Sequence, residues 1–293
     1  MRKFYTKDCP EQLTVSKWLK KSTDWEKLMT VVKPSREYPT VMKLKVEDFD
    51  PDQMAASILK ATDIYGDHGW KSAEGESDGY TGFSLVYNPA HQDGLDPHSS
   101  TLGTPRNSAA EFFWNRTENH QILKNSYFDG YGFTTPTPAS DYDLVGKFMA
   151  RSRRTRVRSR LSILNGWVYD ENRIELRGWH KDEPIFENLR INIPVTTSKD
   201  YLFQVEKKPP RHLDVGWAYT WNTFEPHRVY NASKNEDRRI HFVLGYSPWW
   251  DYIPEEQAWV QNEFYGNKHP FDMIVDGDVF AGLTLDEDSP QVY

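Results

Sequence analysis

The feature that most constrains the fold of this chain is a series of short segments between residues 156 and 246 in which apolar and polar side chains alternate. A period of two indicates β-strands with one face in a core, because successive side chains of a strand point to opposite faces. Turn-forming residues separate the segments at intervals of about a dozen residues, which is typical of a barrel or jelly roll. Strands are predicted at residues 156–168, 186–196, 200–206, 215–222 and 238–246.

The sequence before these strands has a different, more helical texture. Residues 50–62 carry a helix start, with Asp50 as the cap and a proline in the first turn. Further helices are predicted at residues 107–124 and 140–152. The stretch at 63–105 is rich in Gly, Asp, Ser and Pro, so we expect a long loop there.

We expect residues 1–293 to form a single domain, because no linker composition separates the two textures. Residues 1–150 would be its helix- and loop-rich N-terminal part, and residues 151–248 its β core. Residues 249–293 would be a C-terminal extension rich in Trp, Pro and acidic residues, with at most short helices such as 254–264.

The composition argues against several classes of protein. The 36 basic and 43 acidic side chains give a formal net charge of −7, so we do not expect a nucleic-acid partner. A single cysteine, Cys9, excludes an internal disulfide and a cysteine-rich metal site. No apolar run approaches 18 residues, and the first residues lack the apolar stretch of a secretory signal. We therefore expect a cytoplasmic protein without a membrane span; its oligomeric state stays open.

Six arginines occupy ten positions in the run RSRRTRVRSR, residues 151–160. Such a run can attract an anionic substrate or nucleic acid. The interpretation we favour is a solvated helix C-terminus, where positive charge is favourable, followed by a strand. Arg156, Arg158 and Arg160 would lie on the exposed face of that strand.

Three His-x-Asp motifs are candidates for a mononuclear iron site, which takes two histidines and one carboxylate. In a strand, residues i and i+2 share a face, so both side chains can reach one ion. Chance alone supplies about one such motif in a chain of this composition, so the context must distinguish them. The three motifs are His91-Gln-Asp93, His180-Lys-Asp182 and His212-Leu-Asp214.

The context favours the pair His180 and Asp182. His227 follows a later predicted strand, and Arg239 lies twelve positions beyond it, on the same strand face as His241. A late histidine followed by an arginine on a core strand fits an iron site that also binds an organic dicarboxylate, because a guanidinium pairs with a carboxylate through two hydrogen bonds. The first motif lies in a Gly- and Pro-rich loop and the third in a predicted turn, which makes both weaker candidates.

Residues 160–248 resemble the aspartyl/asparaginyl β-hydroxylase family of Fe(II)- and 2-oxoglutarate-dependent oxygenases. The resemblance implies a mainly β fold with flanking helices around a double-stranded β-helix core, a jelly roll of the cupin type. It is carried by these blocks in the same order: Ser162-Ile-Leu-Asn-Gly166, His180-x-Asp182, Leu189-Arg-Ile-Asn-Ile-Pro194, Gly216 eleven residues before His227, and Arg239-Ile-His-Phe-Val-Leu244.

The resemblance also implies roles for individual residues. The catalytic iron ligands are His180, Asp182 and His227. The C5 carboxylate of 2-oxoglutarate pairs with Arg239; the neighbouring Arg238 is disfavoured by the strand alternation. Further contacts to the cosubstrate come from Ser162, Arg190 and Asn192.

The implied activity is hydroxylation, with Fe(II), 2-oxoglutarate and O2, of an unactivated C–H bond. The substrate is an amino-acid-like small molecule or a peptidyl Asp/Asn-type side chain. An intact carboxylate at Asp182 favours the small-molecule branch, because the peptidyl hydroxylases of the family lack it.

Two alternatives stay open: a non-catalytic jelly-roll module for binding or structure, and an iron enzyme that does not use 2-oxoglutarate. The complete ligand set argues against the first. Arg239 argues against the second, because a buried arginine without a dicarboxylate ligand needs an internal acid partner.

Overall fold

The structure is a computed structural model that describes residues 1–9, 15–23, 25–66, 80–87, 130–164, 179–232 and 237–285. The helix predicted at 107–124, most of the loop predicted at 63–105 and the end of the first predicted strand lie outside these residues. His91 and Asp93 lie outside them as well.

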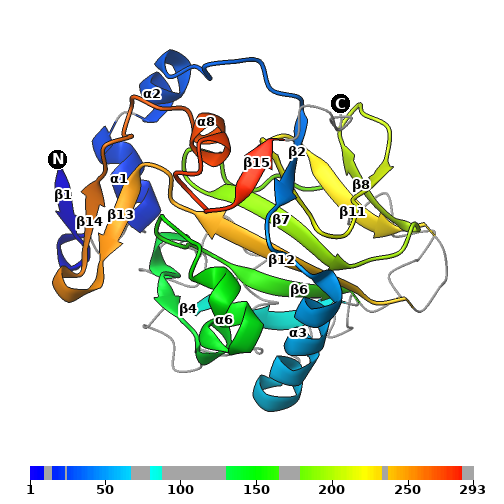
Figure 1. Cartoon of the computed structure of the whole chain (residues 1–293). Helices are drawn as coiled ribbons and strands as arrows, with labels where there is room; N and C mark the ends of the chain where they lie inside the picture. Colours follow the sequence, from blue (N-terminus) through cyan, green and yellow to red (C-terminus); the bar gives the residue numbers. More distant parts are fainter. Residues whose placement is uncertain are drawn as a thin grey trace, which may run out of the picture.

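A seven-stranded antiparallel sheet forms the centre of the molecule (Figure 1), with the strand order β15-β2-β10-β7-β12-β6-β3. Four of the predicted strands lie in this sheet and are confirmed, with shorter bounds than expected. The seven strands are β2 (Val41–Val46), β3 (Tyr80–Ser84), β6 (Arg160–Leu164), β7 (Leu189–Thr196), β10 (Trp217–Trp221), β12 (Arg239–Tyr246) and β15 (Leu283–Leu285).

A smaller sheet has the order β11-β8-β9, with β8 (Tyr201–Val205), β9 (Arg211–His212) and β11 (His227–Asn231). It packs against the large sheet through a buried cluster in which Phe203 and Val205 contact Tyr219 and Trp221. From β6 to β12 the chain passes back and forth between the two sheets, and the large sheet has β6, β12, β7 and β10 side by side. This winding is that of a double-stranded β-helix, and the predicted fold class is confirmed.

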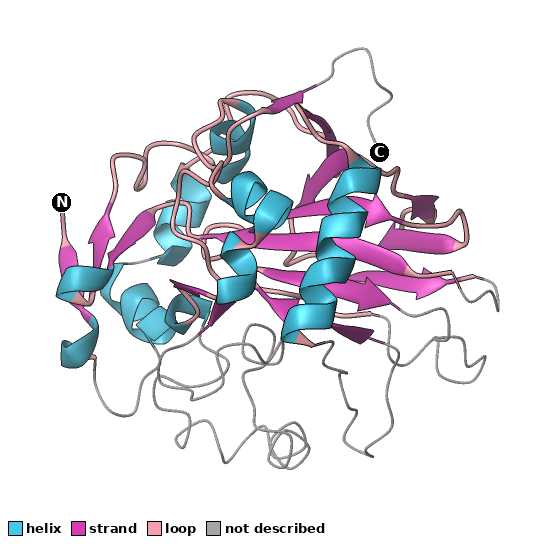
Figure 2. Cartoon of the chain, turned by 60° about the horizontal axis from the view of Figure 1, so that its bottom comes forward, coloured by secondary structure: helices cyan, strands magenta, loops and turns pink. Residues whose placement is uncertain are grey.

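The two faces of the large sheet differ in chemistry, although β12 is buried along its whole length. One face is apolar and lies beneath helices, which Figure 2 shows crossing it. Phe148 of α6 (Asp143–Met149) packs on Phe242 with 5.0 Å between ring centroids, and α3 (Pro51–Tyr65) packs against β7. The other face looks toward the small sheet and carries polar side chains of β6, β7 and β12.

The helix predicted at residues 50–62 is α3, and its start is confirmed. The Asp50 side chain accepts hydrogen bonds from the backbone nitrogens of Asp52 and Gln53 at 3.0 and 3.1 Å. The helix predicted at 140–152 is the shorter α6, which follows the 3-10 helix η4 (Pro138–Asp141).

The helix expected at residues 254–264 is wrong. A 3-10 turn, η5 (Pro254–Glu256), and Gln257 in the left-handed region reverse the chain there. The residues that follow form β14 (Ala258–Gln261), which pairs with β13 (Trp250–Ile253) on one side and with β1 (Lys3–Tyr5) on the other. Pairing with a strand from the opposite end of the chain thus overrides the local sequence pattern.

The remaining described elements are short. They are η1 (Thr6–Asp8), α1 (Val15–Thr23), α2 (Trp25–Val31), β4 (Val86–Tyr87), η3 (Gly130–Gly132), β5 (Thr135–Pro136) and α8 (Pro270–Val275). None of the helices in the described part of the chain has the length and apolar character that a membrane span requires. One buried cluster includes residues from Phe4 to Leu283. The division of the chain at residues 150 and 248 stays a prediction.

The arginine run at 151–160 does not form a solvated face. Arg151 donates to the carbonyls of Ala281 and Gly282 at 2.9 and 3.1 Å. Arg154 donates to the carbonyl of Asp278 at 3.1 Å. These carbonyls lie in the irregular segment before β15, and guanidinium groups supply the donors that a strand partner would otherwise provide.

The three arginines expected on an exposed face, Arg156, Arg158 and Arg160, are each half-buried. Arg158 forms an ion pair with Glu183. The expectation of an exposed face is therefore wrong, because the fold partly covers all three side chains.

Candidate metal centre

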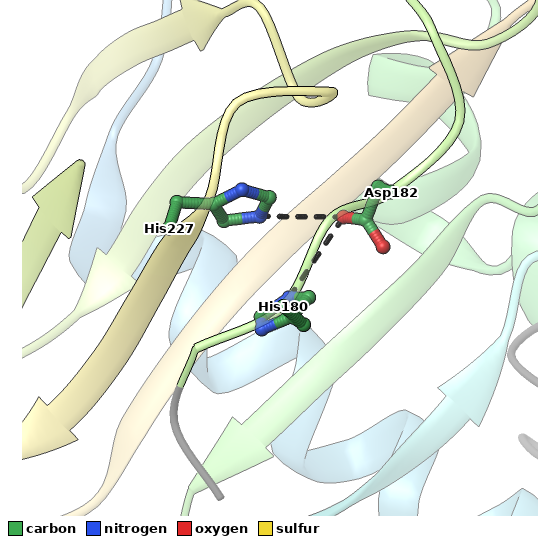
Figure 3. A group of neighbouring side chains, drawn as sticks. All are labelled: His180, Asp182 and His227. Carbon is green, nitrogen blue, oxygen red and sulfur yellow. Dashed lines mark ion pairs between the residues drawn. The ribbon is translucent and has the colours of Figure 1, made fainter. Parts of the chain in front are cut away.

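Three of the predicted site residues, His180, Asp182 and His227, come together at the edge of the small sheet (Figure 3). The Asp182 Oδ2 atom lies 3.9 Å from His180 Nε2 and 3.4 Å from His227 Nε2. One ligand atom from each of the three residues lies within 4.8 Å of the others. Two imidazoles and one carboxylate at this spacing form the donor set of a mononuclear non-haem iron site.

The backbone fixes the spacing of these side chains. His180 and His227 exchange two backbone hydrogen bonds, each with an N–O distance of 3.0 Å, so His180 extends the small sheet beside β11. The Asp182 backbone nitrogen donates to the Thr223 carbonyl at 2.9 Å. These bonds place the two residues of the His-x-Asp motif on the side that His227 faces.

His227 is held in the tautomer that a metal ligand needs. Its Nδ1 lies 2.9 Å from the Glu225 carbonyl, which can only accept a hydrogen bond. In the neutral imidazole, Nδ1 therefore carries the proton and Nε2 carries the lone pair that faces Asp182. The ring is buried and lies edge-on to Trp221, whereas the His180 side chain is half exposed.

Asp182 is poised to stay ionised. Burial raises the pKa of this carboxyl, but the Arg190 guanidinium and, when they are protonated, His227 and His180 outweigh burial. Together they hold the pKa of Asp182 well below its usual range. A metal ligand must be deprotonated, so this environment suits metal binding.

Arg190 lies against the ligand carboxylate itself. One of its terminal nitrogens pairs with Asp182 Oδ2, and the other donates to Glu183 Oε2 at 3.0 Å. The sequence predicts Arg190 near the cosubstrate, and that role stays a prediction. Glu183 was not among the predicted site residues, yet it is part of the site; its position directly after Asp182 was the available signal.

Arg239 is buried on the polar face of the large sheet, and its Nη2 lies 2.6 Å from His241 Nδ1. Its neighbour Arg238 is exposed, so the alternation places the two arginines as expected. Burial, then Arg239 and then His212, lower the pKa of His241 well below its usual value. His241 is therefore neutral, with Nδ1 accepting from Arg239 and the proton on Nε2.

Ser162 and Asn192 share this face with Arg239. Ser162 pairs with His241 across β6 and β12, and Asn192 pairs with Val243 across β7 and β12. Residues directly opposite each other in antiparallel strands have side chains on the same face. The cosubstrate residues predicted from the resemblance thus lie on one surface, behind the small sheet.

Two residues of this surface, Arg239 and His241, line a narrow crevice that has no room for a water molecule. Two buried donors on the surface, Asn192 Nδ2 and His241 Nε2, lack a hydrogen-bond partner among the described residues. An unpartnered buried donor costs about 1–3 kcal/mol, and an anion that only accepts hydrogen bonds would recover that cost. The positive charge of Arg239 and the two donors suit a dicarboxylate in charge and hydrogen bonding. The crevice is lined by Thr197, Tyr201, Leu202, Phe203, Leu213, Val229, Arg239 and His241.

The His212-Leu-Asp214 motif does not join the metal centre. His212 Nδ1 lies 3.3 Å from the Tyr201 carbonyl, and Asp214 pairs with Lys43 at 2.8 Å. Both side chains thus have other partners, as the weaker context of this motif predicts.

No protein-family model matches the sequence, and no curated protein matches it. A solved structure similar to this chain is described as an oxidoreductase of the 2OG-Fe(II) oxygenase family from Burkholderia pseudomallei. It shares 10% sequence identity, with a TM-score of 0.35, over 71% of this chain and 85% of that chain. A likeness this low carries no weight for function. The functional assignment therefore depends on the winding of the sheets and on the side chains of the metal centre.

Proposed function

We propose that this protein is an Fe(II)- and 2-oxoglutarate-dependent dioxygenase. It hydroxylates an unactivated C–H bond of an amino-acid-like small molecule or of a peptidyl Asp/Asn-type side chain. The observation that carries the proposal is the convergence of His180, Asp182 and His227, two imidazoles and one ionised carboxylate, at the edge of a double-stranded β-helix. Three protein ligands leave positions on the ion for other molecules, which suits a catalytic site better than a structural one.

The residues form two groups with different roles: one binds the metal ion and the other binds 2-oxoglutarate. His180, Asp182 and His227 hold the ion. Arg239 takes the distal carboxylate of 2-oxoglutarate, because it is a permanent cation on the buried polar face of the sheet. Ser162 and Asn192 supply hydrogen bonds beside it.

Bound iron would supply the redox chemistry by which O2 oxidises 2-oxoglutarate to succinate and CO2 and hydroxylates a C–H bond. The protein supplies position and enclosure. His227 is fixed by the Glu225 carbonyl, and Asp182 is fixed by Arg190. His180 is the exposed member of the set, so a substrate would approach from its side.

The proposal is tested by anaerobic titration of the purified protein with Fe(II) and then 2-oxoglutarate, with the visible absorption band of the chelate as the readout. We expect the band in the wild type and its loss in His180→Ala and Arg239→Ala. Arg238→Ala is the matched control, because this arginine is adjacent in sequence but exposed; it should keep the band.

The outcomes separate the alternatives. Iron binding without the band would contradict the cosubstrate assignment and favour an iron enzyme of another kind. Failure to bind iron would contradict the ligand assignment and favour a binding module. If the band forms, succinate release with free amino acids and with Asp- or Asn-containing peptides distinguishes the two substrate classes.

A further inference from the structure

Four charged side chains of alternating sign form a chain that starts at the metal centre. Asp182 pairs with Arg190, Arg190 with Glu183, and Glu183 with Arg158. All four are largely withdrawn from solvent, with side-chain exposures of 17%, 6%, 18% and 13% in that order. Ion pairs at this depth are sensitive to the loss of one partner, because the remaining charge stays buried.

Glu183 is held firmly in this chain. Its Oε2 accepts from Arg190 Nη2 at 3.0 Å and from Asn188 Nδ2 at 3.3 Å. Its backbone carbonyl accepts from the Thr223 hydroxyl at 2.7 Å. Thr223 is also the residue whose carbonyl holds the Asp182 backbone, so both acidic residues are fixed to the same turn.

Arg158 reaches Glu183 from the residues just before β6. Its backbone has φ of +51°, in the left-handed region that non-glycine residues rarely adopt. Such a conformation is strained and persists where surrounding interactions impose it. Its ion pair with Glu183 is one of those interactions.

The two terminal nitrogens of Arg190, the fork of its guanidinium, contact different acids, Asp182 and Glu183. This division has a consequence for the metal centre. A guanidinium can bind a single carboxylate with two parallel hydrogen bonds, and that arrangement would engage both oxygens of Asp182. Here Glu183 takes one of the two terminal nitrogens, so Arg190 contacts Asp182 with the other alone, at Oδ2, the oxygen that also faces both histidines. Anchored on Glu183, the guanidinium holds the Asp182 carboxylate in this orientation.

We propose that Glu183 is a positioning residue of the metal centre: by anchoring Arg190, it fixes the orientation in which the Asp182 carboxylate faces His180 and His227. Arg158 keeps Glu183 in place. This inference rests on the proposed function insofar as it requires a metal at the His180–Asp182–His227 group.

The test measures Co(II) affinity of the full chain by the visible absorption of the bound ion, without cosubstrate. Residues that orient the metal ligands without touching the ion typically contribute 10- to 100-fold to metal affinity. We therefore expect Glu183→Gln to bind Co(II) at least about 10-fold more weakly than the wild type. The decisive variant is the double substitution Glu183→Gln with Arg190→Gln. Because Glu183 acts through Arg190, the double variant should bind Co(II) no more weakly than Arg190→Gln alone, whereas a merely structural role of Glu183 would add its own loss.

The matched control is Glu263→Gln. Arg154 also divides its fork between two acids, Asp251 at 2.8 Å and Glu263 at 3.0 Å, in contacts separate from the metal centre. Removing one of these acids should leave Co(II) affinity unchanged. If Glu183→Gln does not fold, Glu183→Asp, whose shorter side chain cannot reach Arg190 in the same way, carries the same expectation.

Unchanged affinity in Glu183→Gln, or a double variant that binds Co(II) clearly more weakly than Arg190→Gln alone, would overturn the inference. A wild type that binds no Co(II) would overturn both the inference and the proposed function. A wild type that binds Co(II) and shows the expected variant pattern, but fails to bind 2-oxoglutarate, would overturn the proposed function and leave the inference standing.

Discussion

Replacing Arg151 by methionine should destabilise the fold by several kcal/mol. The Arg151 guanidinium donates three hydrogen bonds to backbone carbonyls, to Ala281 at 2.9 Å, to Glu47 at 2.8 Å and to Gly282 at 3.1 Å. Charged donors contribute about 1.5–3 kcal/mol each when buried, and we take about 1 kcal/mol each because this side chain is half-buried. The expected loss is therefore about 3 kcal/mol. Methionine keeps much of the apolar packing, so the loss reports the hydrogen bonds.

Urea unfolding followed by both tryptophan fluorescence and circular dichroism measures this loss, with the slope of the transition checked for constancy. Arg153→Met is the control. Arg153 belongs to the same run but is exposed and donates one hydrogen bond, to Gly277 at 3.0 Å, so its loss should cost at most about 1 kcal/mol. If Arg151→Met is no more destabilising than Arg153→Met, the internal role assigned to the arginine run is wrong.

Three further substitutions test other parts of the structure, all by urea unfolding. Phe242→Ala removes a fully buried ring beneath the helices and should cost about 3–5 kcal/mol; a loss below 1 kcal/mol would contradict the packing described for that face. Gly245→Ala places a methyl group against a backbone oxygen and a buried amide oxygen, and should destabilise the protein although alanine suits a strand no worse than glycine. Burial raises the pKa of Asp272, but hydrogen bonds from Tyr38 and Ser35 outweigh burial and lower it. Asp272→Asn should therefore lower the free energy of unfolding at pH 7, and this loss should shrink as pH falls below about 4 and the carboxylate takes up a proton. An equal loss at pH 7 and pH 3 would refute this reasoning.

The strands of the core were predictable because their signal is local. The alternation in β7 and β12 is visible in the sequence, and both strands lie within the predicted bounds. The same alternation selected Arg239 over Arg238, and the structure buries the first and exposes the second. The His-x-Asp spacing together with the downstream context likewise predicted that His180 and Asp182 lie at one centre.

Errors arose where partners are distant in sequence. The helix expected at 254–264 gave way to β14, whose partner β1 lies at the other end of the chain. The local pattern predicts a solvated arginine run because the carbonyls that accept from Arg151, in Glu47, Ala281 and Gly282, lie 104 to 131 positions away in the sequence. Glu183 was missed because its role is defined by Arg190 and Arg158, and no pattern within a single strand reveals that relation.

The backbone bridge between His180 and His227 gives the metal centre a mechanical role in addition to a chemical one. These residues are 47 positions apart in the sequence, and two hydrogen bonds join them at the edge of the small sheet. An ion held by both imidazoles would act as a removable cross-link across that edge, closing the intervening chain into a loop. Loading the ion would then oppose fraying of the sheet margin, and fraying of the margin would release the ion. The affinity for the ion and the free energy of local opening of β11 would thus be linked, so that tighter ion binding makes opening rarer and easier opening weakens ion binding.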